Sequence, residues 1–304
     1  MKRKVISIML AFAMLCALVP CIAMAEDVAS GVCGTNVTWT LDDSGTLTIS
    51  GSGEIYISSS NDLNNHKSEI TKIVVESGIT YADFHRLSKC SLMTALEISD
   101  TVTEIEFPND NFPALTSIKV SADNATFSSK DGLLLDKSGQ TLIKYPVGRD
   151  DLVYTIPEGI TCIGSGAFSQ SKLTKIVIPD FVTEINPAFQ SCSALTEIEV
   201  SENNANYCSV DGVLFDKAKE SILAYPAGKQ QTSYTIPETV TKIGWTAFMG
   251  SDNIETIVIP DTVRTIDGSA FAYCTSLVNI TLPETLETIS GWLTFEGFFK
   301  AYRK

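Results

Sequence analysis

The stretch Leu173 to Cys192, LTKIVIPDFVTEINPAFQSC, decides the fold, because its apolar pattern returns along most of the chain. The stretch Ile254 to Cys274 reads IETIVIPDTVRTIDGSAFAYC and repeats the same apolar residues in the same order. Leu277 reopens the pattern as LVNITLP. Self-similarity at a fixed period of about 20 to 50 residues is typical of a solenoid, in which each turn stacks on the next.

The first apolar residue of each unit sets the spacing of the repeat. These anchor positions are Ile70, Met93, Leu115, Asp151, Leu173, Leu195, Gln231, Ile254 and Leu277. Two steps, from 115 to 151 and from 195 to 231, are longer and hold nearly the same segment. The two segments are SSKDGLLLDKSGQTLIKYPVG at 128–148 and CSVDGVLFDKAKESILAYPAG at 208–228. A superrepeat of about 80 residues therefore overlies the short repeat, and we expect β-hairpin inserts in residues 121–150 and 201–230.

Within one unit the pattern predicts two short extended segments. Ile176 and Ile178 alternate with outward residues as in a strand, and Pro179 ends that strand because it cannot donate to a ladder. A second segment leads to Phe189, which we expect to be buried between adjacent turns, and to Cys192. A lone unit cannot bury its apolar face, so stacked units must share that face and pair their backbones in parallel. The predicted fold is a β-rich repeat solenoid with short parallel strands.

The two ends of the chain depart from the repeat. Residues 1–25 have a basic start, an apolar run and an Ala-Met-Ala ending, which is the layout of a secretory signal peptide cleaved before Glu26. Residues 33–53 alternate around a polar turn, so residues 26–66 are predicted to form an N-terminal β-hairpin cap for the open edge of the first turn. Residues 67–291 form the predicted solenoid, and residues 292–304 are interpreted as a C-terminal cap or an aromatic contact tail.

Charge and composition limit the classes of partner. The 304-residue chain carries a net charge of -14, and removal of three cationic residues with the signal peptide gives -17. Nucleic-acid binding requires a basic surface, so we expect no nucleic-acid partner. The apolar run of the signal peptide is short for a membrane span, and we expect no transmembrane span in the mature chain. The protein is predicted to be exported, secreted or held at the cell surface, as a monomer.

The repeat unit LxxIxIPxxVxxIxxxAFxxC resembles the BspA-like leucine-rich repeats of bacterial surface proteins. The opening VTWTLDDSGTLTISGSG (37–53) is similar to the segment that often precedes such repeats, and DGVLFDK with ILAYPAG resembles their hairpin insert. The resemblance covers residues 33–289. It implies a right-handed solenoid with a curved parallel sheet, and a role in binding proteins of a host or of other microbes. The unit after Ile70 departs from the pattern, and no cell-wall sorting motif occurs, so the route of attachment stays open.

The chemistry-bearing residues do not form a catalytic or metal-binding pattern. Six cysteines follow the signal peptide; Cys90, Cys192 and Cys274 fall at one core position of different units and are predicted to be buried thiols. Export would permit disulfides, and that question stays open. No CxxC motif occurs, and His66 and His85 are the only histidines. We therefore predict no metal, no cofactor and no enzymatic activity.

The predicted binding face follows from the alternation of side chains across a strand. Residues between the inward ones form two outward ladders. The first ladder is Lys72, Ala95, Ser117, Val153, Lys175, Glu197, Ser233, Thr256 and Asn279; the second is Val74, Glu97, Lys119, Thr155, Val177, Glu199, Thr235, Val258 and Thr281. Nine strands about 4.8 Å apart would form one strip about 38 Å long.

This strip lacks aromatic residues and mixes Lys with Glu, which favours a protein partner. The residues predicted to bind it are Lys72, Val74, Glu97, Ser117, Lys119, Thr155, Lys175, Val177, Glu197, Glu199, Thr235, Thr256, Val258, Asn279 and Thr281. The predicted function is an adhesin-like module. The alternatives are a structural spacer of a cell-envelope assembly, since β-branched residues also suit an exposed sheet with no partner, and carbohydrate binding.

Overall fold

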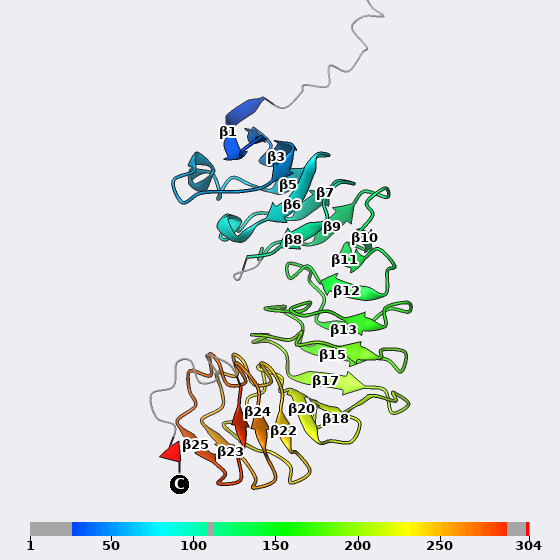
Figure 1. Ribbon diagram of the computed structural model, residues 1–304, viewed down its shortest axis with the longest axis vertical. Helices are drawn as coiled ribbons and strands as arrows, with labels where there is room; N and C mark the ends of the chain where they lie inside the picture. Colours follow the sequence, from blue (N-terminus) through cyan, green and yellow to red (C-terminus); the bar gives the residue numbers. More distant parts are fainter. Residues whose placement is uncertain (1–25, 109–111, 291–301, 304) are drawn as a thin grey trace, which may run out of the picture.

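The computed structural model describes residues 26–108, 112–290 and 302–303, and its regular structure is almost entirely short strands. The strands stack as successive turns of one elongated coil, from β1 (Asp27–Gly34) at one end to β25 (Asn279–Leu282) near the other (Figure 1). This confirms the predicted β-solenoid. The predicted signal peptide and most of the predicted C-terminal tail lie outside the described residues, and the domain boundaries stay predictions.

The first strands of the turns pair in parallel, in register with the repeat. They form three sheets: β3 (Thr46–Gly51), β5 (Lys72–Val75), β7 (Ala95–Ile98) and β9 (Ser117–Val120); β13 (Val153–Thr155), β15 (Lys175–Ile178) and β17 (Glu197–Val200); and β21 (Ser233–Thr235), β23 (Thr256–Val258) and β25, to which β27 (Tyr302–Arg303) adds. Along each of these strands, inward residues are buried and the residues between them face outward. In β15, for example, Ile176 is buried and Lys175 faces outward.

The predicted single strip of nine strands is wrong, because each insert interrupts the sheet. The first insert folds β10 (Phe127–Lys130) and β11 (Leu133–Asp136) into a hairpin, whose turn has positive φ at both Asp131 (52°) and Gly132 (80°). An Asp-Gly pair suits this turn type. The N–H of Ile118 donates to Gly132 O at 2.9 Å, so the hairpin tip occupies the place where the next first strand would pair.

The second insert repeats this arrangement. Its hairpin consists of β18 (Tyr207–Val210) and β19 (Val213–Asp216), and Ile198 N–H donates to Gly212 O at 2.9 Å. Each insert continues into a third strand, β12 (Thr141–Lys144) or β20 (Ser221–Ala224), which pairs in parallel with the second strand of the following turn. The insert is therefore a hairpin placed between the first and second strands of one turn.

The second strands of the other turns have two to five residues. They are β4 (Gly53–Glu54), β6 (Ile79–Asp83), β8 (Glu104–Glu106), β14 (Cys162–Ile163), β16 (Glu184–Ile185), β22 (Lys242–Ile243), β24 (Thr265–Ile266) and β26 (Thr288–Ile289). Short 3₁₀ helices η1 (Asp62–Asn65) and η2 (His85–Leu87) follow β4 and β6. At the N-terminal end β1 and β2 (Val37–Asp42) add antiparallel strands to β3, which itself pairs in parallel with β5. This meander covers the open edge of the first turn.

A buried asparagine ties each insert to the preceding turn. In the second insert, Asn204 Nδ2 donates to Pro179 O at 2.8 Å and to Val182 O at 2.9 Å, while its Oδ1 accepts the N–H groups of Asn206 and Tyr207. Asn124 makes the equivalent four contacts in the first insert. One side chain thus satisfies two N–H groups at the start of the hairpin and bonds two carbonyl groups of the preceding turn.

Aromatic side chains stack between turns in the core. Phe248 lies 5.2 Å from Tyr225 and 5.2 Å from Phe271 between ring centroids, and is fully buried. The predicted burial of Phe189 is wrong: its ring stacks on Phe168 at 5.7 Å but stays partly exposed. Phe189 ends its stack because the next turn carries an insert and diverges. The thiols predicted to be buried are buried, and all six cysteines of the described residues are free.

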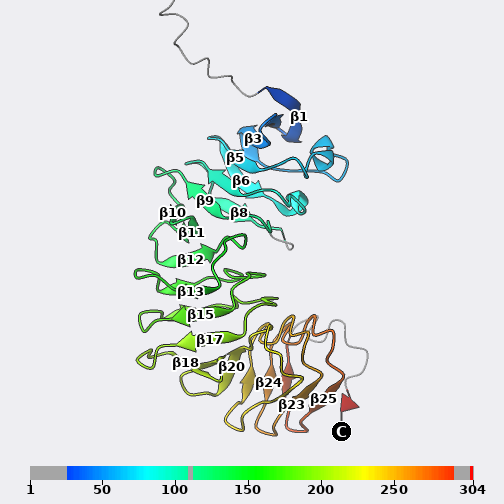
Figure 2. The ribbon, with the colours of Figure 1, turned by 180° about the vertical axis from the view of Figure 1, so that it is seen from behind.

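The stack of turns changes direction at the second insert. In Figures 1 and 2 the strands β22 to β25 run in a different direction from β13, β15 and β17, and the C-terminal turns fold back below the loops of the central turns. The N–H of Ser191 donates to Met249 O at 3.3 Å across this bend. Loops that follow the second strands therefore meet on the inner side of the bend. Within the described residues, no helix has the length and apolar character needed to cross a membrane.

Candidate functional site

The predicted protein-binding residues all lie on the outward side of first strands, and none of them is buried. The register confirms the ladders within each sheet, for example Lys175 opposite Glu197 and Thr256 opposite Asn279. The structure divides them among the three sheets. The first sheet holds Lys72, Val74, Glu97, Ser117 and Lys119, the second holds Thr155, Lys175, Val177, Glu197 and Glu199, and the third holds Thr235, Thr256, Val258, Asn279 and Thr281.

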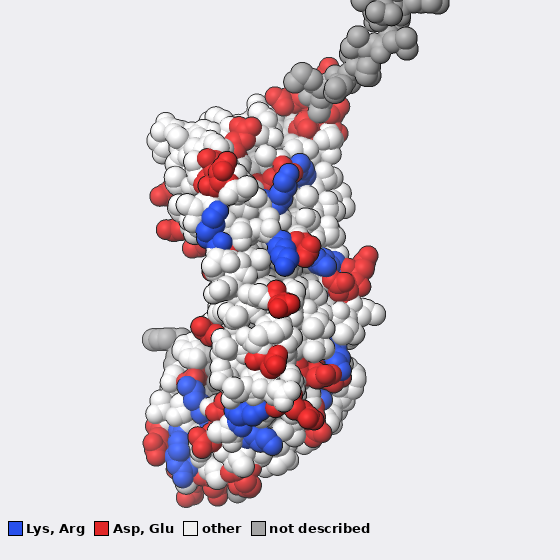
Figure 3. Space-filling view, turned by 90° about the vertical axis from the view of Figure 1, so that its right-hand side faces the viewer, with Lys and Arg blue, Asp and Glu red and all other residues white. Residues whose placement is uncertain are grey.

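Charges on this sheet face are paired across strands. Lys72 Nζ lies 3.1 Å from Glu97 Oε1, and Lys175 Nζ lies 2.9 Å from Glu197 Oε1 and 2.5 Å from Glu199 Oε2. Hydrogen bonds to Glu199 and then to Glu197 raise the pKa of Lys175. Figure 3, which views the molecule from the right-hand side of Figure 1, shows basic and acidic residues next to one another rather than gathered by sign. Exposed pairs of this kind contribute little to stability and leave a surface of mixed charge.

A polar cavity of about 890 Å³ opens among loops on the inner side of the bend. It receives residues from turns that are far apart in sequence. Its wall includes His85, Glu106, Phe107, Lys144, Ser165, Gly166, Gln190, Ser191, Met249 and Tyr273. Sequence analysis did not predict this cavity, because it depends on how the C-terminal turns fold back on the central ones.

Lys144 is the unusual residue of the polar cavity. It occupies an inward position of β12, and only 7% of the residue is exposed. Its Nζ lies 3.5 Å from Gly166 O and 5.4 Å from the centroid of the Phe107 ring. Burial lowers the pKa of the Lys144 ammonium group to about 8, because the charged form loses its hydration.

A histidine between two carboxylates lies at the rim of the same cavity. His85 Nδ1 is 2.9 Å from Asp83 Oδ1 and 3.2 Å from Glu106 Oε2. The three ligand atoms lie within 4.8 Å of one another, an arrangement that could hold a metal ion. Sequence analysis expected no metal site; the available signal was that Asp83 and Glu106 fall one repeat apart, and the strand register places them opposite each other.

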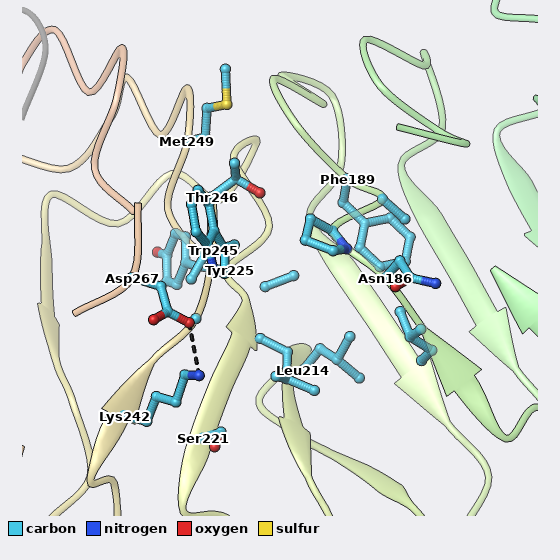
Figure 4. Close-up of a pocket in the computed structure, with 17 residues that line it drawn as sticks. Asn186, Phe189, Leu214, Ser221, Tyr225, Lys242, Trp245, Thr246, Met249 and Asp267 are labelled. Carbon is cyan, nitrogen blue, oxygen red and sulfur yellow. Dashed lines mark ion pairs between the residues drawn. The ribbon is translucent and has the colours of Figure 1, made fainter. Parts of the chain in front are cut away.

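An aromatic cavity of about 220 Å³ lies at the second insert. Figure 4 shows Trp245 and Tyr225 on one side of it and Phe189 on the other, with Leu214 between them. Trp245 is 51% exposed. Below it Lys242 Nζ pairs with the buried carboxylate of Asp267 at 2.8 Å. The partial exposure of Phe189 is explained by its position on this wall.

The two cavities occupy the same place in the two superrepeats. Residues 80 positions apart correspond, as Leu115 and Leu195 do. By this spacing Lys144 corresponds to Ala224, and Ser165 corresponds to Trp245, so the first cavity has an ammonium group and a hydroxyl group where the second has a methyl group and an indole ring. One backbone frame therefore carries two different chemistries.

Comparison with known proteins identifies the repeat. The family model described as BspA type leucine rich repeat region matches in six copies, over residues 153–216 and 224–298. No curated protein sequence matches the chain. Among solved structures, the chain is similar to a leucine-rich repeat protein from Eubacterium ventriosum ATCC 27560, with a TM-score of 0.54 and 28% identity, over 86% of this chain and 68% of that one.

Two further solved structures are similar at lower scores. One is a leucine rich cell surface protein from Faecalibacterium prausnitzii A2-165, with a TM-score of 0.42 and 19% identity, over 90% of this chain and 87% of that one. The other is the pneumococcal vaccine antigen PcpA, with a TM-score of 0.40 and 14% identity, over 87% and 78%. The six matched copies and the parallel strands of successive turns lead to one conclusion. Residues 153–216 and 224–298 match leucine-rich repeats of the BspA type, and the parallel turns of the solenoid are those of a leucine-rich repeat fold.

Proposed function

We propose that the protein is an exported, adhesin-like module that binds a protein partner through the outward face of its parallel sheets. The observation that carries this proposal is the outward side of the second sheet, where Lys175, Glu197 and Glu199 form a charged group beside the exposed Val153 and Thr155. Such a surface offers both signs of charge and no aromatic platform, which suits a protein better than a sugar. Catalysis forms no part of the proposed role.

The outward face of one sheet is too small for a specific protein interface. Three strands span only about 10 Å between the first and the last, whereas a specific interface buries about 800 Å² on each partner. A partner must therefore reach across an insert, from the second sheet to the first. The tip of the first insert lies between these sheets and is fixed by Arg149, whose Nη1 donates to Asp131 O at 2.7 Å.

The test uses the secreted chain against purified extracellular matrix proteins and surface proteins of other bacteria. Once a partner is found, the charged quartet of Lys119, Lys175, Glu197 and Glu199 is reversed in sign in one variant. We expect at least a tenfold loss of affinity. A matched control reverses an ion pair elsewhere, Arg264 with Glu287, which lie 3.7 Å apart, and should bind as the wild type does.

A second variant separates the sheet face from the inserts. It replaces the exposed hairpin residues Lys130 and Val210 with Glu. If this change abolishes binding while the quartet reversal leaves it intact, the partner binds the inserts and the proposed sheet face is wrong. If neither change affects a partner that binds, both surfaces are excluded; if no partner is found, a spacer role gains support.

A further inference from the structure

The ammonium group of Lys144 is buried in the wall of the polar cavity. Among the described residues, no carboxylate lies within ion-pair distance of its Nζ. The Cys192 thiol lies close enough to influence it, but burial raises the pKa of that thiol to about 11, so it is neutral at pH 7. A buried charge without a partner is unfavourable. An anion bound in the cavity would supply the missing charge.

The internal duplication shows that the fold does not require this lysine. Ala224 occupies the corresponding position in the second superrepeat, also inward in its strand and also buried. The two flanking sequences, TLIKYPVG and SILAYPAG, are otherwise closely similar. The repeat therefore folds without a lysine at this position. The ammonium group of Lys144 has its role in the cavity and not in the folding of the repeat.

The size of the cavity indicates a small molecule rather than a simple ion. Its volume of about 890 Å³ falls in the range of about 300 to 1,000 Å³ that ligand sites occupy. Its wall presents the hydroxyl groups of Ser165 and Ser191 and the aromatic rings of Phe107 and Tyr273. It also holds the amide of Gln190, whose Oε1 accepts from Ser169 Oγ and whose Nε2 donates to Pro187 O, so that one lone pair and one N–H remain. Hydroxyl and amide groups pair with sugar hydroxyls, and an aromatic ring packs against the apolar face of a sugar.

The charges of the wall favour a ligand with a single negative charge. One lysine faces the cavity from β12, and Glu106 with His85 belongs to the same wall. A multiply charged phosphate would be repelled by Glu106, whereas a single carboxylate can bind at Lys144 through a charge-assisted hydrogen bond. A peptide would require apolar pockets for its side chains, which suit the aromatic cavity better.

We propose that the polar cavity is a binding site for a sugar that carries one carboxylate, of the uronic acid class. Lys144 Nζ donates to the carboxylate, and the hydroxyl and amide groups of Ser165, Gln190 and Ser191 pair with ring hydroxyls. The site shares no residue with the sheet face. It would let the protein recognise an acidic polysaccharide independently of a protein partner.

The test compares a tetrasaccharide that contains glucuronic acid with the same tetrasaccharide after reduction of its carboxyl groups to alcohols. Binding to the secreted chain is measured by isothermal titration calorimetry and by saturation-transfer NMR. We expect the acidic form to bind at least tenfold more tightly than the neutral form. The variant Lys144→Ala, which introduces the residue of the second superrepeat, should lose at least tenfold in affinity. The variant Lys130→Ala, at an exposed lysine, should bind as the wild type does.

Four results would overturn the site. Equal binding of the acidic and reduced sugars, or undiminished binding by a folded Lys144→Ala protein, would exclude Lys144 as the carboxylate-binding group. Tighter binding of a short peptide that depends on its free C-terminal carboxylate would assign the cavity to peptides. Displacement of the tetrasaccharide by millimolar inorganic phosphate would reduce it to a general anion site. The proposed sheet face is tested independently of the cavity. Reversal of the charged quartet should leave sugar binding unchanged, because the two sites share no residue.

Discussion

Replacement of Lys144 by Met should stabilise the protein at neutral pH. The pKa of the Lys144 ammonium group falls from 10.5 to about 8 because burial removes its hydration. One pKa unit corresponds to about 1.4 kcal/mol, so the buried charge reduces the free energy of unfolding by about 3 kcal/mol. Met has a similar length and no charge, and it keeps the apolar contacts of the lysine stem. After loss of the cation–π contact with Phe107, worth about 1 kcal/mol, a net gain of about 2 kcal/mol remains.

The gain should depend on pH in a direction that identifies its cause. Below about pH 8 the lysine is charged in both the folded and the unfolded protein, and the full penalty is present. Between about 8 and 10.5 the unfolded chain binds the proton and the folded chain does not, so wild-type stability rises with pH. Above 10.5 the penalty disappears, and Lys144→Met loses its advantage.

Urea unfolding at pH 7 and at pH 10 measures this difference. The other titratable groups of the cavity, His85, Glu106 and Tyr273, together with Cys192 beneath it, are present in both proteins, so subtraction isolates Lys144. Lys130→Met at an exposed position is the control and should change stability by less than about 0.5 kcal/mol. A Lys144→Met protein that is less stable than the wild type at pH 7, or a gain that is equal at both pH values, would refute the reasoning.

The remaining predictions concern the face, the core and the N-terminus. Reversal of the charged quartet should shift the melting temperature by only a few degrees, because exposed charges contribute little to stability; a loss of cooperative melting would show that the face is structural. Phe248→Ala should lower the free energy of unfolding by about 3 to 5 kcal/mol, and Phe189→Ala by about half as much, since its ring is partly exposed; equal losses in urea melts would contradict the assigned burial. Asn204→Ala should lower it by at least about 2 kcal/mol, since it removes four side-chain hydrogen bonds to backbone groups, and amide hydrogen exchange should become faster at residues 204–210. N-terminal sequencing of the secreted protein should begin at Glu26; a sequence beginning at Met1 would exclude cleavage.

Local pattern predicted the parts of the fold that each turn determines for itself. The alternation in Lys175–Ile178 fixes which residues face outward, because a strand has a period of two. The recurrence of Cys90, Cys192 and Cys274 at one position of the unit predicts their burial, because equivalent positions of stacked turns share one environment. Neither conclusion requires knowledge of how distant turns meet.

The features that sequence analysis missed depend on contacts between turns. The sheet breaks because Gly132 O takes the hydrogen bond of the next strand, and the ladder count gives no sign of this. Phe189 loses its cover because the following turn diverges. Lys144 reads as a surface residue in the segment IKYPVG, since its burial arises from loops that fold over β12. The signal in the sequence is the difference between Lys144 and its counterpart Ala224 in the second superrepeat, where an inward alanine indicates a buried position.

The two superrepeats show which side chains the same position of the fold accepts. The same position accepts a buried ammonium group in one copy and a methyl group in the other, although the ammonium group reduces stability by about 3 kcal/mol. A residue with that effect on stability, placed where the frame accepts alanine, is typical of sites at which binding is gained at the expense of stability. In the second copy Trp245 fills the wall instead and needs no counter-charge. If Lys144 binds an acidic sugar, that sugar should therefore raise the stability of the wild type and leave Lys144→Ala unchanged, because a ligand stabilises only the protein that binds it.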